Sequence, residues 1–237
     1  MSEQNGTIKI GDVNPFSIVD FPDRIAAVVF MQGCPWRCPF CYNTELQPLN
    51  LTDEPMWTFE KFLMFVQKRK HALDGVVFSG GEPLLQKGLP QAIESVKNLG
   101  FEIGLHTGGY YPEALKKVVL LIDWAGLDVK GPKEKYKALT GGFDAFDEVC
   151  KSLDVLLESG VDFECRTTCD PRLLTTEDIY ELGKFLKQKG IKKYYLQKYR
   201  PTENDKTTSD SACEALISDT NLISFLRESF EKFDVRR

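Results

Sequence analysis

Three cysteines lie close together in the segment Cys34-Pro-Trp-Arg-Cys38-Pro-Phe-Cys41. Their spacing is C-x3-C-x2-C, and they directly follow an apolar run that ends near Gly33. Thiolates on one short loop can converge on a single polynuclear metal centre, such as an iron–sulfur cluster. A [4Fe–4S] cluster normally takes four cysteines, so three would leave one iron with an open position. An open position is typical of a reactive centre rather than of an electron carrier.

Two other roles for these cysteines remain open on the sequence. A structural zinc site needs a fourth cysteine or histidine at a similar local spacing, whereas the two histidines, His71 and His106, lie far along the chain. The thiols could also be inert core residues. Pro35 and Pro39 favour a loop around an inorganic core, because proline suits neither a helix interior nor a central strand.

A second candidate site is the segment Ser79-Gly80-Gly81-Glu82-Pro83, which follows a predicted strand. Glycines at such a position let the backbone approach a ligand without a Cβ in the way. The Glu82 carboxylate could bind an ammonium group. Taken alone, the segment is equally well explained as an ordinary loop between a strand and a helix.

Short β-rich apolar runs alternate with longer amphipathic stretches along the chain. The predicted strands are 25–30, 75–78, 101–105, 124–129, 163–168 and 194–197, and the predicted helices are 57–68, 89–99, 112–121, 143–159, 175–189 and 221–233. Strands that each precede a helix indicate a parallel sheet with right-handed connections. The predicted fold class is therefore α/β. Because six units are too few for an eight-fold barrel, we expect a partial (β/α)6 TIM-like barrel with parallel strands, and a doubly wound open sheet is the alternative.

The composition narrows the classes of protein. Of 237 residues, 42% are hydrophobic and 27% are charged, which is typical of a soluble globular chain. The net charge of −5 argues against a protein that mainly neutralises nucleic-acid phosphates, and no stretch approaches the ~20 apolar residues of a membrane span. We therefore expect no nucleic acid and no membrane among the partners. Residues 1–11 lack a signal-peptide pattern and the seven cysteines cannot all pair, so we expect a cytoplasmic protein with reduced thiols.

The chain length favours a single domain over residues 1–237, with 1–22 as an N-terminal extension and 199–237 as a C-terminal loop and helix. Too few residues follow the sixth unit to form a separate substrate-binding domain. The remaining cysteines have no assigned role, and core or surface thiols are favoured over a second cluster. They are Cys150, Cys165, Cys169 and Cys213.

Together the two motifs resemble the radical S-adenosylmethionine superfamily, whose cysteine motif has the same spacing with an aromatic residue, here Phe40, before the third cysteine. Its GGEP motif matches Gly80, Gly81, Glu82 and Pro83. The resemblance implies that Cys34, Cys38 and Cys41 hold three irons of a [4Fe–4S] cluster. It also implies that S-adenosylmethionine chelates the fourth iron through its amine and carboxylate. Reductive cleavage would then give a 5′-deoxyadenosyl radical, which the protein must shield from water.

Three later segments extend the resemblance to enzymes that activate other proteins. His106-Thr107-Gly108-Gly109 stands where these enzymes usually carry Asp-Thr-Asn-Gly, and Asp128-Val129-Lys130 matches their Asp-Leu-Lys. Arg166 falls where they have an arginine that reaches the cofactor carboxylate, a contact suited to the guanidinium fork. The resemblance makes Thr107, Asp128, Lys130 and Arg166 cofactor-binding candidates. His106 in place of aspartate weakens the case for a cation site there.

Each of these candidates also has a structural alternative. Arg166 could simply pair with Glu164 or Asp170 at the edge of its strand. Asp128 and Lys130 could form a buried ion pair at the mouth of the barrel. Two departures from the family pattern lie close to the cofactor, since Tyr42 replaces the common histidine after the third cysteine and Gly108 replaces an asparagine.

Two segments narrow the resemblance to activating enzymes of glycyl-radical enzymes. Residues 14–22 (NPFSIVDFP) resemble the segment that precedes the cluster in these activases. Residues 196–201 (LQKYRP) resemble the activating proteins of anaerobic ribonucleoside-triphosphate reductase, with pyruvate formate-lyase activating enzymes as near neighbours. The implied partners are a glycyl-radical enzyme, as protein substrate, and an electron donor such as flavodoxin or ferredoxin. No catalytic residue is assigned beyond the cluster.

Two other functions remain as alternatives. One is a radical enzyme that acts on a small molecule, such as a 7-carboxy-7-deazaguanine synthase, which shares the cysteine motif and can be equally compact. The other is a non-catalytic iron–sulfur electron carrier or scaffold. The carrier would have no need of Glu82, Arg166 or the second glycine loop, so these residues favour an enzyme.

Overall fold

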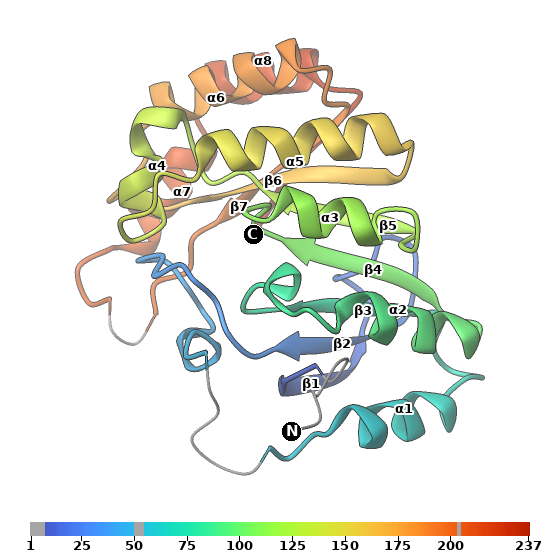
Figure 1. Cartoon of the computed structure of the whole chain (residues 1–237). Helices are drawn as coiled ribbons and strands as arrows, with labels where there is room; N and C mark the ends of the chain where they lie inside the picture. The colour runs from blue at the N-terminus through green and yellow to red at the C-terminus, as the bar shows by residue number, and fades with distance from the viewer. Residues whose placement is uncertain (1–7, 50–54, 203–204) are drawn as a thin grey trace.

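The computed structural model describes residues 8–49, 55–202 and 205–237. The centre of this described part is an eight-stranded sheet in the order β1 to β8, in which β2 to β8 run parallel and β1 pairs antiparallel with β2 (Figure 1). The strands are β1 (Ile10–Ser17), β2 (Ala26–Met31), β3 (Gly75–Gly80), β4 (Glu102–Thr107), β5 (Trp124–Asp128), β6 (Asp162–Cys169), β7 (Lys193–Lys198) and β8 (Lys232–Arg236). The sheet is open, with β1 and β8 at its edges, and the predicted α/β fold of a partial barrel is confirmed.

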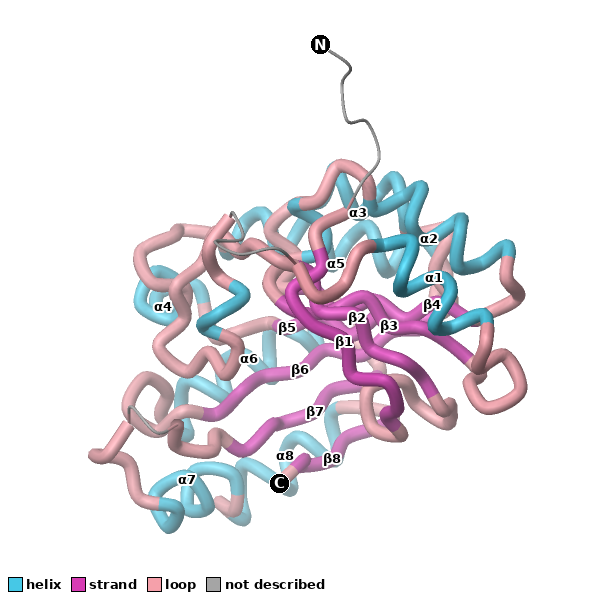
Figure 2. Tube along the Cα trace, turned by 90° about the horizontal axis from the view of Figure 1, so that it is seen from below, coloured by secondary structure: helices cyan, strands magenta, loops and turns pink. Residues whose placement is uncertain are grey.

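Most helices cover one face of this sheet, and two short helices lie at one end of it. The helices are α1 (Phe59–Gln67), α2 (Leu89–Asn98), α3 (Pro112–Val118), α4 (Lys133–Leu139), α5 (Phe146–Ser159), α6 (Thr176–Gln188), α7 (Asp210–Ile217) and α8 (Thr220–Ser229), with short 3-10 turns η1 (Thr44–Leu46) and η2 (Pro83–Leu85). Contacts link α1 to α2, α2 to α3, α3 to α5, and α6 to α8, so these helices form one layer (Figures 1 and 2). Helices α4 and α7 lie at the end to which the parallel strands point (Figure 1).

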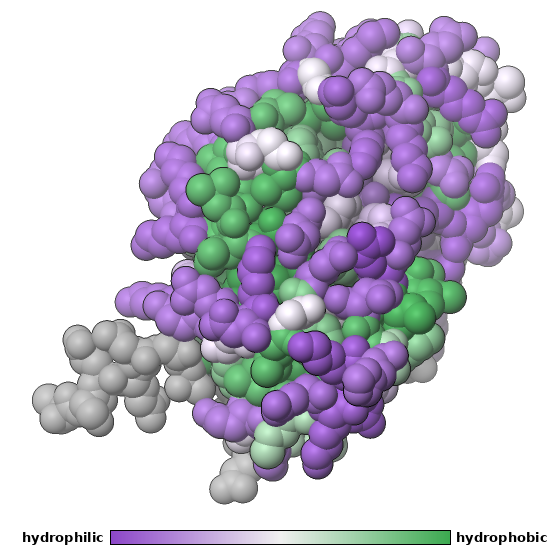
Figure 3. Space-filling model, turned by 90° about the vertical axis from the view of Figure 1, so that its right-hand side faces the viewer, coloured by the Kyte–Doolittle hydropathy of each residue, from purple (hydrophilic) through white to green (hydrophobic). Residues whose placement is uncertain are grey.

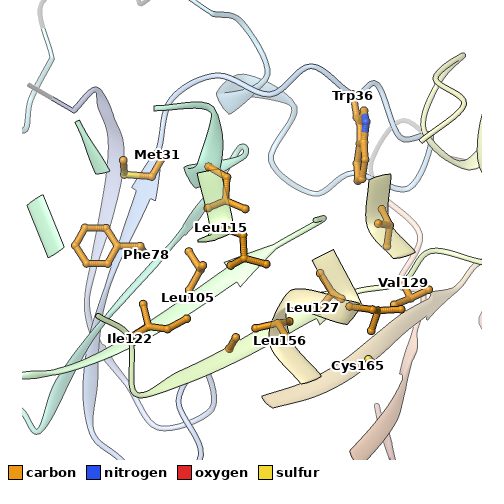
Figure 4. Packing of buried hydrophobic residues seen from close by; sticks show 14 of the residues in the cluster. Met31, Trp36, Phe78, Leu105, Leu115, Ile122, Leu127, Val129, Leu156 and Cys165 are labelled. Atoms are coloured by element: carbon orange, nitrogen blue, oxygen red, sulfur yellow. The ribbon is translucent and has the colours of Figure 1, made fainter. Parts of the chain in front are cut away.

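The two faces of the sheet carry different cores, because successive side chains of a strand point to opposite faces. Phe78, Leu105 and Leu127 point from β3, β4 and β5 toward the helices, where they pack with Leu115 and Leu156 (Figure 4). A smaller cluster occupies the inner face, and it consists of Phe21, Ala26, Val28, Val77 and Trp124. The inner face is thus only partly apolar, and its other positions are available to site residues.

Local signals explain why the helices begin and end where they do. The Thr58 hydroxyl accepts a hydrogen bond from the Lys61 amide and caps α1. Thr175 and Asp178 form a reciprocal capping box at the start of α6. Gly160 ends α5 in the left-handed region, with φ of 74°, where a side chain would be strained. Every predicted strand and helix is present, each shifted by at most a few residues.

The two ends of the chain differ from the prediction. The predicted extension 1–22 contributes β1, so part of it belongs to the sheet. The predicted helix 221–233 ends near Ser229, since Phe230 adopts extended backbone and packs on Tyr194, and β8 follows. The expected loop and helix of 199–237 therefore contain α7, α8 and a strand. Helix α4 was also not predicted.

One face of the molecule shows mostly polar side chains (Figure 3). Hydrophilic side chains cover much of the face in Figure 3, and hydrophobic ones show in patches between them. Among the helices of the described residues, none combines the length and the apolar character of a membrane span. The single domain over 1–237 stays a prediction, and residues 1–7 of the extension lie outside the described residues.

Candidate active site

A cavity of 510 Å³ opens on the inner face of the sheet, where the parallel strands end. All seven parallel strands contribute at least one residue to its wall, and so do the residues directly after Cys41. In parallel α/β folds the carboxyl ends of the strands are where active sites gather. The lining includes Asp20, Tyr42, Asn43, Ser79, Gly80, Gly81, His106, Thr107, Asp128, Arg166, Gln197, Arg200 and Arg236.

The cysteine loop crosses the end of β2 and is held by backbone hydrogen bonds. The Gly33 amide donates to the Leu46 carbonyl at 2.7 Å, and the Arg37 amide donates to the Thr140 carbonyl at 3.0 Å. The Arg37 guanidinium also donates to the Cys34 carbonyl at 2.8 Å, which ties the loop to itself. These hydrogen bonds fix the conformation of the loop. The three thiols lie on this one loop, as their spacing in the sequence predicts.

The thiols of this loop are free and partly buried. None of the seven cysteines, all of which lie in the described ranges, forms a disulfide. Burial raises the pKa of Cys34 to about 12, and the nearby Glu82 carboxylate adds to the effect. Burial also raises the pKa of Cys38, while the Lys130 ammonium opposes it. Because metal ligands must be thiolates, loading this loop with iron would release protons. No group of three or more His, Cys, Asp or Glu in the described residues is arranged to hold a single metal ion.

The GGEP segment interlocks with the cysteine loop through backbone contact. The Glu82 amide donates to the Gly33 carbonyl at 2.9 Å. A Cβ on Gly81 would lie 2.3 Å from that same carbonyl oxygen, and a Cβ on Gly80 would lie 2.3 Å from the Met31 nitrogen. The glycines are thus required for protein backbone to pack on protein backbone, besides lining the cavity.

Glu82 is buried and joins this segment to the end of β4. Its carboxylate accepts from the Thr107 hydroxyl at 2.7 Å, the Gly108 amide at 2.9 Å and the Leu84 amide at 3.1 Å. Burial raises the pKa of Glu82 even though these donors oppose it. A carboxylate offers about four acceptor positions, so one further donor could be accommodated. Pro83 begins η2 directly after it.

Asp128 lies between two cations at the ends of β5 and β6. The Arg166 Nε is 2.9 Å from one carboxylate oxygen, and the Lys130 Nζ is 3.3 Å from the other. Burial raises the pKa of Asp128, but Arg166 and Lys130 outweigh it and hold that pKa at about 2. The guanidinium lies across Gly126, where a Cβ would be 2.7 Å from the Arg166 Cζ. Lys130 also lies 5.6 Å from the Phe40 ring, which connects this charge group to the cysteine loop.

Of the ion pairs predicted as structural alternatives for Asp128, Lys130 and Arg166, one is present and the other is not. The ion pair of Asp128 and Lys130 is present. The pairing of Arg166 with Glu164 or Asp170 is wrong, since Arg166 pairs with Asp128 across neighbouring strands, where the two residues are in register. Glu164 instead pairs with Arg236 of β8 at 2.5 and 2.9 Å. Asp170 pairs with Arg172.

The predicted site residues fall into two groups. Gly80, Gly81, Thr107, Asp128 and Arg166 line the cavity. The others are not among the lining residues, and they are Cys34, Cys38, Cys41, Phe40, Glu82, Pro83 and Lys130. Two of these contact lining residues, since Glu82 accepts from Thr107 and Lys130 pairs with Asp128.

Two cavity residues that the sequence did not assign are His106 and Arg236. His106 donates from Nε2 to the Asp20 carbonyl at 2.8 Å, and its Nδ1 lies 3.3 Å from the Ser79 hydroxyl. It thereby holds the segment before β2 against the inner face. Arg236 stacks on Tyr195 with its Cζ 3.9 Å from the ring centroid. A signal for Arg236 was missing, because no strand was predicted after residue 197 and the predicted helix 221–233 overlapped the start of β8.

Comparison with known proteins gives the class. Residues 28–186 match the model of the Radical SAM superfamily, and the chain belongs to that superfamily. It is therefore an enzyme of the radical S-adenosylmethionine class, and the cofactors of the family are a [4Fe–4S] cluster and S-adenosylmethionine.

The relatives narrow the class further. The chain is 32% identical over 207 residues to the pyruvate formate-lyase-activating enzyme of Clostridium pasteurianum, covering 81% of this chain and 82% of that protein. It is 29% identical to MJ1227 of Methanocaldococcus jannaschii, whose name assigns it to the glycyl-radical enzyme activating enzymes, over 82% of this chain and 81% of that one.

Solved structures show the same fold at low identity. SuiB of Streptococcus suis bound to its precursor peptide SuiA has a TM-score of 0.69 and 15% identity over 89% of this chain. The chain spans about half the length of SuiB, 48% in that structure. QueE from Escherichia coli has a TM-score of 0.57 and 16% identity, with 97% of this chain and 94% of QueE covered.

Proposed function

We propose that the chain is an activating enzyme that generates a glycyl radical on a partner protein. The observation that carries this proposal is the cavity wall, where Gly80, Gly81, Thr107, Asp128 and Arg166 meet the residues that follow Cys41. The names of the two relatives support the same activity. The free thiols fit a reducing compartment such as the cytoplasm.

In this proposal Cys34, Cys38 and Cys41 bind the cluster and the cavity receives S-adenosylmethionine. The donor set fits, because the three thiols are unpaired and share one loop. When bound, the cluster and S-adenosylmethionine would together supply a one-electron reductive cleavage of the sulfonium, whose radical product would take a hydrogen atom from the partner's glycine.

The chain's own residues bind and orient the cofactor. Glu82 accepts a hydrogen bond from the methionyl ammonium, with Gly80, Gly81 and Pro83 shaping the loop that presents it. Arg166, oriented by Asp128, binds the methionyl carboxylate. Thr107 completes this part of the wall through its hydrogen bond to Glu82. Lys130 and Phe40 connect the wall to the cysteine loop, since Lys130 offsets negative charge beside Cys38.

We propose anaerobic ribonucleoside-triphosphate reductase as the partner enzyme. The support is the segment 196–201, in which Gln197, Lys198 and Arg200 line the cavity and could contact a partner loop. The Arg200 amide donates to the Tyr42 hydroxyl at 2.7 Å, so the segment contacts the residue after Cys41. Pyruvate formate-lyase is the second candidate, favoured by the 32% identity to its activating enzyme.

The test is anaerobic reconstitution with iron and sulfide, followed by dithionite and S-adenosylmethionine. We expect 5′-deoxyadenosine and, with one of the two candidate partners, a glycyl doublet in the electron spin resonance spectrum. A partner with its target glycine replaced by alanine is the matched control and should give no doublet. Cofactor cleavage without a protein radical on any glycyl-radical enzyme of the source would favour the small-molecule alternative, whereas a cluster without cleavage would indicate an electron carrier.

A further inference from the structure

A second cavity, of 270 Å³, lies on the helix-covered side of the sheet, where η2 and the start of α2 meet α3. Its walls are mainly apolar and include Leu84, Leu85, Pro90 and Val118. Two lysines, Lys87 and Lys117, also line it, and no Asp or Glu is among its described lining residues. We call this cavity the η2–α3 groove. It takes no part in the site described above.

The η2–α3 groove lies one layer of residues away from the cysteine loop. Leu85 lines the groove, and its Cδ2 would lie 3.2 Å from a Cβ on Gly33. Gly33 directly precedes Cys34, and its carbonyl accepts from the Glu82 amide at the start of η2. The η2 wall of the groove thus packs against the residue that directly precedes Cys34.

The two lysines of the groove are exposed and have no ion-pair partner among the described residues. Some other helix lysines are paired, as Lys116 is with Glu113 at 2.7 Å and Lys151 is with Glu148 at 2.6 Å, whereas Lys61 of α1 and Lys137 of α4 are among the described lysines without an ion pair. The chain as a whole carries a net charge of −5. The net negative charge of the chain therefore repels an acidic partner, whereas the two lysines attract it to this groove. Complementary charge of this kind steers and orients association.

We propose that the η2–α3 groove is the docking site of an acidic one-electron carrier protein, which reduces the cluster held by Cys34, Cys38 and Cys41. The carrier loses one electron and the cluster gains it, and no atom is transferred. The apolar walls of the groove receive an apolar edge of the carrier, while Lys87 and Lys117 bind carboxylates around that edge. This proposal rests on the proposed function, because only a reductive enzyme needs the electron.

The experiment uses reduced flavodoxin as the probe and compares two double variants of the reconstituted protein. Lys87→Glu/Lys117→Glu reverses the charge of the groove. Lys68→Glu/Lys232→Glu makes the same change in net charge at exposed lysines directly after α1 and on β8, outside the groove. One readout is the dissociation constant for flavodoxin by calorimetry at low and high salt. The other is the rate of 5′-deoxyadenosine formation, driven either by flavodoxin or by dithionite.

We expect the groove variant to bind flavodoxin roughly tenfold more weakly at low salt and to lose most of the salt dependence of binding. Its flavodoxin-driven rate should fall in proportion, while its dithionite-driven rate matches that of the wild type. The control variant should stay within about twofold of the wild type in every measurement. Equal binding by the two variants, or no binding to the wild-type protein, would overturn the docking site. Absence of dithionite-driven cleavage in the wild type would instead overturn the proposed function.

Discussion

The outer and inner faces of the sheet bury their side chains by different means. On the outer face, Phe78, Leu105 and Leu127 are fully buried in an apolar core. On the inner face near the strand ends, Asp128 pairs with Arg166 and Glu164 pairs with Arg236. Burial of a charge is costly unless a partner is present, so each of these inner charges depends on a residue of another strand. The outer face therefore contributes stability directly, whereas the inner face holds the groups that the reaction needs.

Replacing a cysteine of the loop should give the largest effect and separate chemistry from folding. Cys38→Ser should abolish both cluster incorporation and formation of 5′-deoxyadenosine, because a serine hydroxyl does not replace the thiolate ligand. The thermal midpoint of the cluster-free protein should change little. Iron content, absorbance and product assays check this. Cys150→Ser, at a partly exposed thiol of α5, is the control and should keep cluster and activity. Full activity in the Cys38 variant would contradict the assignment of the loop.

A substitution on the outer face should lower stability and leave the chemistry intact. Phe78→Ala removes a fully buried ring and should lower the free energy of unfolding by about 3–5 kcal/mol, measured by urea denaturation. The molecules that remain folded should still cleave S-adenosylmethionine. Leu120→Ala, at a side chain that is 78% exposed, should change stability by less than about 0.5 kcal/mol. Loss of activity in fully folded Phe78→Ala protein would show that the two faces are not separable.

The same difference decides what could be predicted from the sequence. Buried strands of the sheet are contiguous apolar runs, so β2 to β7 were found within a few residues of their observed ends. Strand β8 has the sequence Lys-Phe-Asp-Val-Arg, lies at an edge and directly follows a helix, so neither its composition nor a turn separated it from α8. Strand β1 is likewise an edge strand of mixed composition.

Site residues divide in the same way. Local motifs identified the cysteine loop and Gly80–Pro83, and the structure interlocks them. Ion pairs across strands depend on how the strands are paired and in which register, which no local motif reveals. The prediction therefore offered Arg166 the nearby Glu164 or Asp170, whereas β5 and β6 place Asp128 beside it. Glu164 could not be paired correctly while β8 was missing.

Breaking the ion pair of the inner face should have an intermediate effect on stability. Arg166→Met leaves Asp128 with only Lys130, and we expect the free energy of unfolding to fall by about 1.5–3 kcal/mol. Asp128→Leu in the same protein should restore part of this loss, because the unpaired carboxylate is gone. Both the single variant and the double variant should bind S-adenosylmethionine more weakly than the wild type, because both lack the Arg166 guanidinium. Denaturation and equilibrium dialysis measure the two quantities.

The matched control for that pair is Arg24 with Glu102, an ion pair of 2.8 Å whose side chains are 39% and 43% exposed. Its double-mutant cycle should give a coupling of roughly 0–1 kcal/mol, because water screens the charges. A coupling between Arg166 and Asp128 no larger than this would contradict the view that the inner face depends on its pairs.

The smallest effect concerns the pH dependence of stability and tests the neutral residue of the inner face. Burial, with the Arg166 charge, lowers the pKa of His106 to about 3, whereas an unfolded histidine has a pKa of about 6.5. Below pH 6.5 the unfolded chain therefore binds a proton at His106 that the folded chain does not bind. The free energy of unfolding falls as the pH decreases. For the cluster-free protein we expect this group to account for a loss of about 1.6 kcal/mol between pH 6.5 and pH 5. His106→Asn should remove that loss.

The raised pKa of Glu82 acts in the opposite sense and is common to both proteins, so it cancels in the comparison. Parallel stability profiles for wild type and variant in this window would mean that His106 is charged in the folded protein, and that the inner face tolerates a cation without a partner.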